Sequence, residues 1–133
     1  MVIDTSALVA IVLGEPGTPD LVAEINHASV RVVASVSMLE AGIVLRARRG
    51  QEGVDALYRL LASFPIGVVV FDETHAKLAI SAFSRFGKGM GHRAQLNFGD
   101  CAVYALAALR GEPVLATGRD FRATDIEIVK LRK

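Results

Sequence analysis

Four acidic residues lie where the predicted buried segments end or turn: Asp4, Glu40, Asp100 and Asp120. Each lies in or beside an apolar run, where an unpaired charge is expensive to hold, and the sequence offers no obvious basic partner. A divalent metal ion is the simplest agent that could neutralise them. Mg²⁺ and Mn²⁺ prefer oxygen ligands and keep several waters, so a few converging carboxylates suffice. We therefore expect a Mg²⁺ site, with Mn²⁺ as a possible substitute, built from these side chains.

Glu40 lies in the middle of an apolar helical stripe. With about 100° between successive residues of a helix, the residues on its face are all apolar: Val36, Ile43, Val44 and Ala47. Arg46 lies well round the helix and offers no partner. A buried Glu bonded to the backbone or to an Arg elsewhere would also fit, but the pattern favours a ligand.

The other three acids each have a structural alternative. Asp4 could cap the helix that follows it, a role that does not exclude metal binding. Asp100 could complete a capping box with Asn97, and Asp120 could be a turn acid paired with Arg119. Taken alone, none of these positions indicates chemistry, so the metal site is predicted from the combination of four.

Other catalytic chemistries find little support in the sequence. His27, His75 and His92 lack the spacing of zinc ligands, and no Ser–His pair is evident. The single cysteine, Cys101, excludes an intramolecular disulfide. A cytoplasmic location is therefore the expectation.

The composition indicates one domain, residues 1–133, with a proper core. The hydrophobic fraction of 52% suits an α/β fold whose sheet is covered on both faces. No apolar run approaches the roughly 18 residues of a membrane span, and the apolar stretch 7–13 lacks a basic segment before it, so neither a membrane partner nor a signal peptide is expected.

Strand-like and helix-like segments alternate along the chain. Strands are predicted at 1–4, 30–34, 66–71, 114–117 and, at an edge, 126–129; helices at 5–13, 19–28, 35–49, 54–63, 72–86 and 98–110, with a loop at 87–97. This alternation predicts a parallel sheet between helical layers. Ligands bind beyond the carboxyl ends of such strands, and Asp4 and Asp120 both fall just past one.

Four segments together resemble a known family. They are MVIDTSAL at 1–8, SMLEA at 37–41, LNFGDC at 96–101 and ATGRDFRATDI at 116–126. In this order and spacing they are similar to PIN-domain proteins, and most similar to the VapC toxins of type II toxin–antitoxin modules. The resemblance covers essentially the whole chain.

The resemblance implies a fold, an activity and partners. The fold would be a three-layer α/β/α PIN domain with a central, mainly parallel sheet. The activity would be Mg²⁺- or Mn²⁺-dependent hydrolysis of RNA phosphodiester bonds by an endoribonuclease. A VapB-type antitoxin would inhibit the toxin, which would form a homodimer and, with antitoxin, a heterotetramer or larger complex.

The resemblance also assigns roles to individual residues. The four acids would hold the metal and carry catalysis, Ser6 would place a hydroxyl near the metal, and Asn97 and Thr117 would support the site. Some relatives have the fourth acid one residue earlier, where this chain has Arg119; the Gly-x-Asp-Phe pattern assigns Asp120. Asp125 is expected to be structural.

RNA must reach an acidic centre, so cationic residues should flank it. The candidates are Arg85, Lys88, His92 and Arg93, around a segment with three glycines. Arg46, Arg48 and Arg49, which end the Glu40 helix, form a second group. An ordinary solvated surface would explain both groups equally well.

Two surfaces are predicted to meet partners. Helices 7–13 and 54–63 carry more apolar residues than a monomer of this size readily hides, which favours a homodimer. An antitoxin helix is expected near helices 7–13 and 36–47, with an Arg that bridges the carboxylates.

Alternative functions were weighed against these expectations. A catalytically inactive PIN-like module that binds RNA or protein is the main one. A haloacid-dehalogenase-type hydrolase would need Asp-x-Asp after the first strand, where the third residue here is Ser6. A receiver domain would need a phosphoacceptor Asp and a late Lys in positions that this chain does not convincingly supply.

Overall fold

The sheet is parallel throughout, with strand order β3–β2–β1–β4. The computed structural model describes residues 1–131. Its strands are short: β1 Val2–Ile3, β2 Val32–Ala34, β3 Gly67–Val69 and β4 Val114–Leu115. Its helices are α1 Thr5–Leu13, α2 Thr18–His27, α3 Ser35–Ser63, α4 Glu73–Phe86 and α5 Phe98–Arg110.

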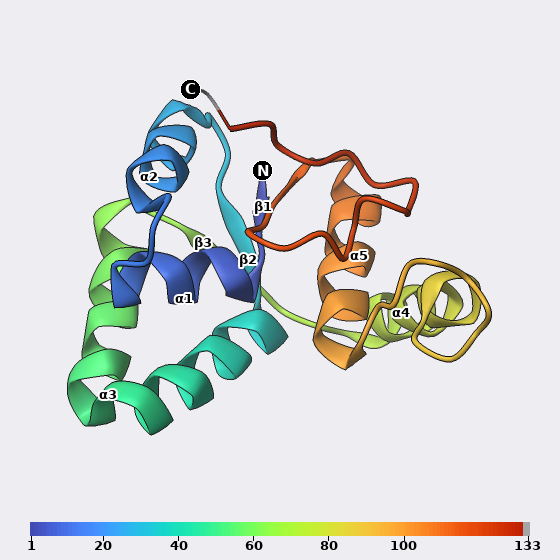
Figure 1. Ribbon diagram of the computed structural model, residues 1–133, viewed down its shortest axis with the longest axis horizontal. Coiled ribbons are helices and arrows are strands. Elements are labelled where there is room, and N and C mark those ends of the chain that lie inside the picture. The colour runs from blue at the N-terminus through green and yellow to red at the C-terminus, as the bar shows by residue number, and fades with distance from the viewer. Residues whose placement is uncertain (132–133) are drawn as a thin grey trace.

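Three layers arise because alternate residues of a strand point to opposite faces of the sheet. Ile3, Val33 and Leu115 pack with buried side chains of α1, α2 and α3. Val2, Val32 and Val114 point the other way, into a second cluster formed mainly with α5 and the end of α4. Figure 1 shows α1, α2 and α3 on one side of the strands and α4 and α5 on the other. The predicted three-layer α/β/α architecture is confirmed.

The register brings the carboxyl ends of the central strands together. Val2 of β1 lies opposite Val32 and Val114, and Ile3 lies opposite Leu115. Because all strands run in the same direction, the residues that follow β1, β2 and β4 emerge at one edge. That edge holds the start of α1, the start of α3 and the loop after β4.

Helix α3 differs from the two helices expected at 35–49 and 54–63. It runs from Ser35 to Ser63 and bends sharply at Gly50, whose φ of 65° and ψ of −156° are not helical. The bend gives two arms joined at a left-handed glycine, where a side chain would be strained. The expected gap between the helices is thus reduced to a kink.

The last predicted strand, 126–129, does not form. Ile128 makes a single parallel bridge to Val114, and hydrogen bonds join Val114 to Glu127 and Val129. The apolar alternation of this segment therefore reflects packing against β4 and α5 rather than a full strand. The strand expected at 66–71 shortens to Gly67–Val69, and Val70 beyond it is exposed.

No helix within residues 1–131 combines the length and the apolar character needed to cross a membrane. The longest helix, α3, carries many charged residues along its length.

The two arms of α3 allow a paired test of packing against helix propensity. A Cβ on Gly53 would lie 2.6 Å from the carbonyl oxygen of Leu45, a backbone atom that cannot move away cheaply. A Cβ on Gly42 would lie 3.8 Å from Leu57 Cδ2, an ordinary contact. We expect Gly53→Ala to lower the free energy of unfolding by about 1–3 kcal/mol, and Gly42→Ala to raise it by up to about 1 kcal/mol.

Urea denaturation of both variants measures these changes, with an unchanged m-value as the sign that stability alone has shifted. Equal effects of the two substitutions would contradict the close approach of the two arms.

Candidate active site

The four predicted acids come from four different elements and meet at the carboxyl edge of the sheet. Asp4 follows β1 and caps α1, Glu40 lies in α3, Asp100 is in the first turn of α5, and Asp120 lies in the loop after β4. Their charges act on one another: those of Glu40 and Asp120 raise the pKa of Asp4, and those of Asp120, Asp4 and Glu40 raise the pKa of Asp100. The chain therefore forms one acidic cluster here.

Asp4 is buried and fixed by Ser6. The Ser6 backbone N–H donates to Asp4 Oδ2 over 3.0 Å, and the Ser6 hydroxyl donates to the same oxygen over 2.5 Å. The same hydroxyl accepts a hydrogen bond from the Thr117 N–H at 3.0 Å. Ser6 thus ties the first acid to the loop that carries the fourth, which gives Ser6 and Thr117 a defined place in the site.

Glu40 lies against the backbone of Gly99. A Cβ on Gly99 would come within 2.7 Å of Glu40 Oε1 and 2.8 Å of Oε2. The absence of a side chain at this position is what leaves room for the carboxylate. This contact explains the Gly in the Asn97-Phe98-Gly99-Asp100 segment, and the sequence reasoning did not assign it a role.

Asp100 and Asn97 form the capping box that was weighed as an alternative. The Asp100 N–H donates to Asn97 Oδ1 at 2.9 Å, and the Asn97 N–H donates to Asp100 Oδ2 at 3.0 Å. Only one carboxylate oxygen is used, so the other can face the cluster. The capping role and the site role are therefore held by the same side chain.

Asp120 is exposed, unlike Asp4 and Asp100. Its loop is anchored by Phe121, which is fully buried in the hydrophobic core cluster that also contains Tyr104 and Phe86. An ideal Cβ on Gly118 would lie 3.4 Å from Asp120 Oδ2, so the loop folds closely around this carboxylate. The structure does not pair Asp120 with Arg119.

The donor set suits a hard divalent cation. The pKa of Asp4 is raised, and that of Asp100 is raised to about 7. Burial is the largest cause in both, and the charges of the neighbouring carboxylates raise both pKa values further. Across residues 1–131 no Lys or Arg forms an ion pair with any of the four. As the side chains stand, no group of three or more His, Cys, Asp or Glu in that range is placed to hold a metal ion. Mg²⁺ needs only one or two direct carboxylates and keeps its waters, so the open cluster fits such an ion.

The predicted RNA-contacting residues separate into two pairs. Arg85 belongs to α4 and not to the loop; it donates to Asp125 Oδ2 at 3.1 Å and to the Tyr104 hydroxyl at 3.2 Å. His92 Nδ1 accepts from the Ala94 N–H, and its ring packs on Phe86. Lys88 and Arg93 are exposed on the loop. Their contact with RNA stays a prediction.

Asp125 proves to be the centre of a network that sequence reasoning could not locate. It accepts from the Tyr104 hydroxyl at 2.6 Å and from Arg85. The Tyr104 and Arg85 hydrogen bonds hold the pKa of Asp125 below its usual value. The structural role expected for Asp125 is consistent with this network, which holds the end of the Asp120 loop on α4 and α5.

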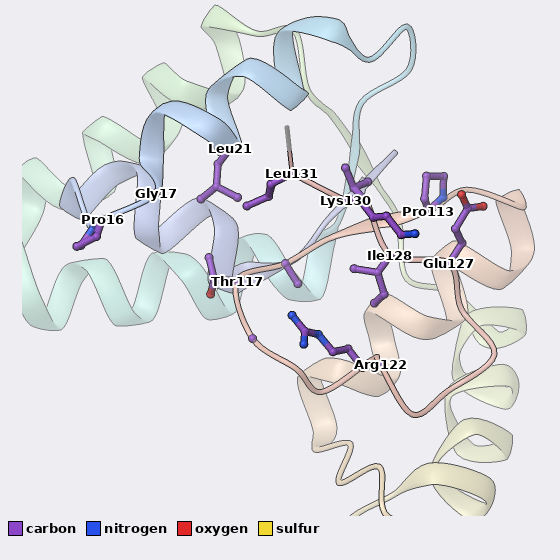
Figure 2. A pocket seen from close by; sticks show the side chains of 13 residues that line it. Pro16, Gly17, Leu21, Pro113, Thr117, Arg122, Glu127, Ile128, Lys130 and Leu131 are labelled. Carbon is purple, nitrogen blue, oxygen red and sulfur yellow. The ribbon is translucent and has the colours of Figure 1, made fainter. Parts of the chain in front are cut away.

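A groove of about 1250 Å³ opens beside the acidic cluster. It runs between the segment 16–21 and the C-terminal part of the chain, 113–131 (Figure 2). Thr117 and Gly118 line its end nearest the acids. Because Thr117 is hydrogen-bonded to Ser6, which holds Asp4, the groove borders directly on the acidic cluster.

Gly99 offers a test of the cluster that spares the fold. We expect Gly99→Ala to displace the Glu40 carboxylate while leaving the free energy of unfolding unchanged or raised, because Ala is the better helix former. Affinity for Mn²⁺, measured by titration calorimetry, should fall roughly 10- to 100-fold, the cost typical of disturbing a metal site's supporting shell. Unchanged affinity would mean that Glu40 does not contribute from this position.

Asp100 predicts a pH dependence of stability in the metal-free protein. Its pKa is raised from 3.8 to about 7, so between those values the folded protein binds more protons than the unfolded chain, and the free energy of unfolding falls as pH rises. This contribution is full below the lower pKa and is lost as pH passes the higher one. Asp100→Asn removes it, so the variant should be the more stable protein above neutral pH.

Thermal unfolding of both proteins in EDTA, across this pH range, measures the difference. Parallel pH profiles for wild type and Asp100→Asn would contradict the raised pKa. With saturating Mg²⁺ the order should reverse, because a ligand stabilises the protein that binds it more tightly.

Comparison with known proteins identifies the family. The PIN domain family matches residues 1–127. The chain is 43% identical to Ribonuclease VapC of Mycolicibacterium smegmatis, over 97% of this chain and 99% of that protein, and 40% identical to Ribonuclease VapC30 of Mycobacterium tuberculosis, over 98% and 99%.

Solved structures show the same fold at low sequence identity. Mycobacterium tuberculosis VapC20, a sarcin–ricin loop cleaving toxin, superposes with a TM-score of 0.80 at 18% identity, covering 97% of this chain and 98% of that one. VapBC2 from Rickettsia felis, bound to a DNA fragment from its promoter, gives 0.72 at 9% identity, covering 98% of both chains. The chain belongs to the PIN domain family and, within it, to the VapC ribonucleases.

Proposed function

We propose that this chain is a Mg²⁺-dependent endoribonuclease, able to use Mn²⁺, that hydrolyses RNA phosphodiester bonds in the cytoplasm as the toxin of a VapBC module. The observation that carries the proposal is the cluster of Asp4, Glu40, Asp100 and Asp120, whose charges are coupled and unpaired by Lys or Arg within residues 1–131. The named activities of the VapC relatives support it.

The four carboxylates would hold the cation, and their supports would set its position. A bound Mg²⁺ supplies positive charge that favours deprotonation of the attacking water and stabilises the charge developing on the phosphate. Ser6 holds Asp4 Oδ2, and Asn97 holds one oxygen of Asp100. Such prior fixation lowers the cost of bringing these like charges together when the ion binds.

The alternative is an inactive PIN-like module that binds RNA or protein. The presence of all four acids, gathered at one edge, favours an enzyme over this alternative. Metal-dependent cleavage is the property that separates the two.

The antitoxin is proposed to dock on the concave side of α3. A groove of about 670 Å³ lies between its two arms, and Leu39 and Ile43 on its rim are 64% and 61% exposed. Helix α1, which was also expected to contribute, has most of its apolar side chains buried or half-buried. An apolar helix lying in a groove of this kind is a recurrent mode of recognition, and toxin–antitoxin complexes are among the structures that share this fold.

A homodimer is proposed through α4 and α5. Ile80 and Phe98 are 67% and 82% exposed beside a small apolar groove between these helices. The surface expected at 7–13 and 54–63 is largely covered, since residues of both segments belong to the core. Phe98 lies next to Asn97 and two residues from Asp100. A second copy bound there would therefore bring two acidic sites near each other. Light scattering of the antitoxin-free protein should give the mass of two chains.

Cleavage tests the proposed function directly. We expect wild-type protein with Mg²⁺ to cut single-stranded RNA and Asp100→Asn to lose at least roughly 100-fold in rate, because disturbing even the outer shell of a metal site typically costs 10–100-fold. Asp55→Asn, which removes one exposed acid from α3, is the matched control and should cut normally. Sequencing of RNA ends after pulsed expression of the three proteins gives the measurement; equal cleavage by wild type and Asp100→Asn would refute the site.

Antitoxin binding tests the α3 groove. We expect Ile43→Glu to weaken binding of the antitoxin by a large factor, because it places a charge in the apolar contact, while RNA cleavage by the free toxin is retained. In the native complex an antitoxin Arg is expected at the carboxylates, so its replacement by Ala should reduce inhibition more than affinity. Inhibition that survives both changes would place the antitoxin elsewhere.

A further inference from the structure

The groove beside the acidic cluster is lined by two cationic side chains that stabilise neither the fold nor the cluster through a hydrogen bond or an ion pair in the described part of the chain. Arg122 and Lys130 both line it, and neither side chain is hydrogen-bonded or ion-paired to any of residues 1–131. In Figure 2 the Arg122 side chain extends into the groove toward the end marked by Thr117. A guanidinium left free in a concave surface points to an anionic ligand.

Two other arginines, Arg31 and Arg85, are already engaged by the fold. Arg31 donates to the carbonyl oxygens of Ile25, Asn26 and Phe64, and so fastens the start of β2 to the surrounding loops. Arg85 is held by Asp125 and Tyr104. These hydrogen bonds are part of the fold, so these two side chains are not available to a ligand without cost.

The groove is continuous with the catalytic carboxylates. Thr117 donates its N–H to Ser6, which holds Asp4, and Gly118 lies against Asp120. A strand whose scissile phosphate lies at the cluster can therefore continue into the groove without leaving the surface. The phosphates on that side need positive charge, because the cluster itself repels them.

The lining suits an unpaired strand. Two cations, Arg122 and Lys130, face one acid, Glu127, while Leu21, Ile128 and Leu131 provide an apolar floor. Cations that follow the backbone together with apolar surface for riboses and bases are the usual features of sites for single-stranded nucleic acid. An A-form duplex is recognised mostly by shape across its wide minor groove, and a concave groove does not present the convex surface that such contacts need.

We propose that the groove between residues 16–21 and 113–131 is the path of single-stranded RNA on one side of the cleaved bond, with Arg122 as a phosphate contact and Lys130 as a second. The proposal rests on the proposed ribonuclease function and names a part of its substrate site. It adds a surface separate from the loop of Lys88 and Arg93, which does not line the groove.

The test uses the full chain carrying Asp100→Asn, so that RNA is bound and not cut. Binding of a fluorescein-labelled single-stranded RNA is followed by anisotropy over a series of KCl concentrations at fixed Mg²⁺. We expect Arg122→Ala to weaken binding and to reduce the slope of log K against log [KCl] by roughly 0.7, the value for one lost phosphate contact on a single strand. Arg122→Lys should keep most of the slope.

Arg110→Ala is the matched control. Arg110 is an exposed cation in the last turn of α5 and does not line the groove, so its loss changes the net charge equally. Its slope should stay that of the parent protein. Equal slopes for Arg122→Ala and Arg110→Ala would overturn the proposal.

Photo-crosslinking of the same RNA, substituted with 4-thiouridine, gives a second measurement that does not depend on a substitution. Crosslinked peptides should come from residues 113–131 or 16–21. Crosslinks confined to other segments would also overturn the proposal. An Arg122→Ala variant that loses affinity for the antitoxin but not for RNA would overturn it as well, since the groove would then bind protein.

Failure of the groove and failure of the proposed function are distinguishable. If wild-type protein cuts RNA and Arg122→Ala keeps its salt slope, the groove alone is wrong. If wild-type protein neither cuts nor binds RNA, the function and the groove are both wrong.

Discussion

Repulsion among four carboxylates is the constraint on which the rest of this structure depends. Parallel strands bring Asp4 and Asp120 to one edge, where Asp100 from the first turn of α5 and Glu40 from α3 join them, and burial makes ionisation of Asp4 and Asp100 costly. Within residues 1–131 the fold holds these groups in place without an ion pair to Lys or Arg, which leaves the cluster open to the proposed Mg²⁺. It does so with neutral donors: the Ser6 hydroxyl and N–H on Asp4, and the Asn97 N–H on Asp100. The cluster is thus held in position but left electrostatically unsatisfied.

The same constraint explains how charges are distributed elsewhere. Two arginines are held by groups outside the cluster: Arg31, just before β2, donates to carbonyl oxygens, and Arg85 is paired with Asp125. The Arg85–Asp125–Tyr104 network anchors the end of the loop that carries Asp120 without bringing a positive charge to Asp120 itself. Arg122 and Lys130, which are not used in this way, lie along the groove that leads away from the acids. Such a separation is what the proposed function requires: a polyanion along the groove and a metal ion at the centre.

The apolar side chains are divided between two buried core clusters and separate exposed surfaces. The two faces of the sheet are covered by α1–α3 and by α4–α5, so both core clusters are complete within the chain. Two exposed apolar surfaces are the concave side of α3, with Leu39 and Ile43, and the outer side of α4 and α5, with Ile80 and Phe98. These are separate surfaces, so one can meet an antitoxin and the other a second copy of the chain without competition.

Features that depend on neighbouring residues could be predicted from local sequence. Capping chemistry placed Asp4 and Asn97 at helix starts, and the helices predicted at 5–13 and 98–110 have the bounds of α1 and α5 in the structure. Strand–helix alternation gave the parallel sheet and so the shared edge of the acids. Only the tertiary structure decided which distant residues meet: Gly99 against Glu40, Asp125 with Arg85 and Tyr104, and Thr117 with Ser6. It also joined two expected helices at Gly50 and reduced the last strand to one bridge. The physical reason is that hydrogen bonds within a turn of helix are fixed by local spacing, whereas contacts between residues about 20 or more positions apart depend on how whole layers pack.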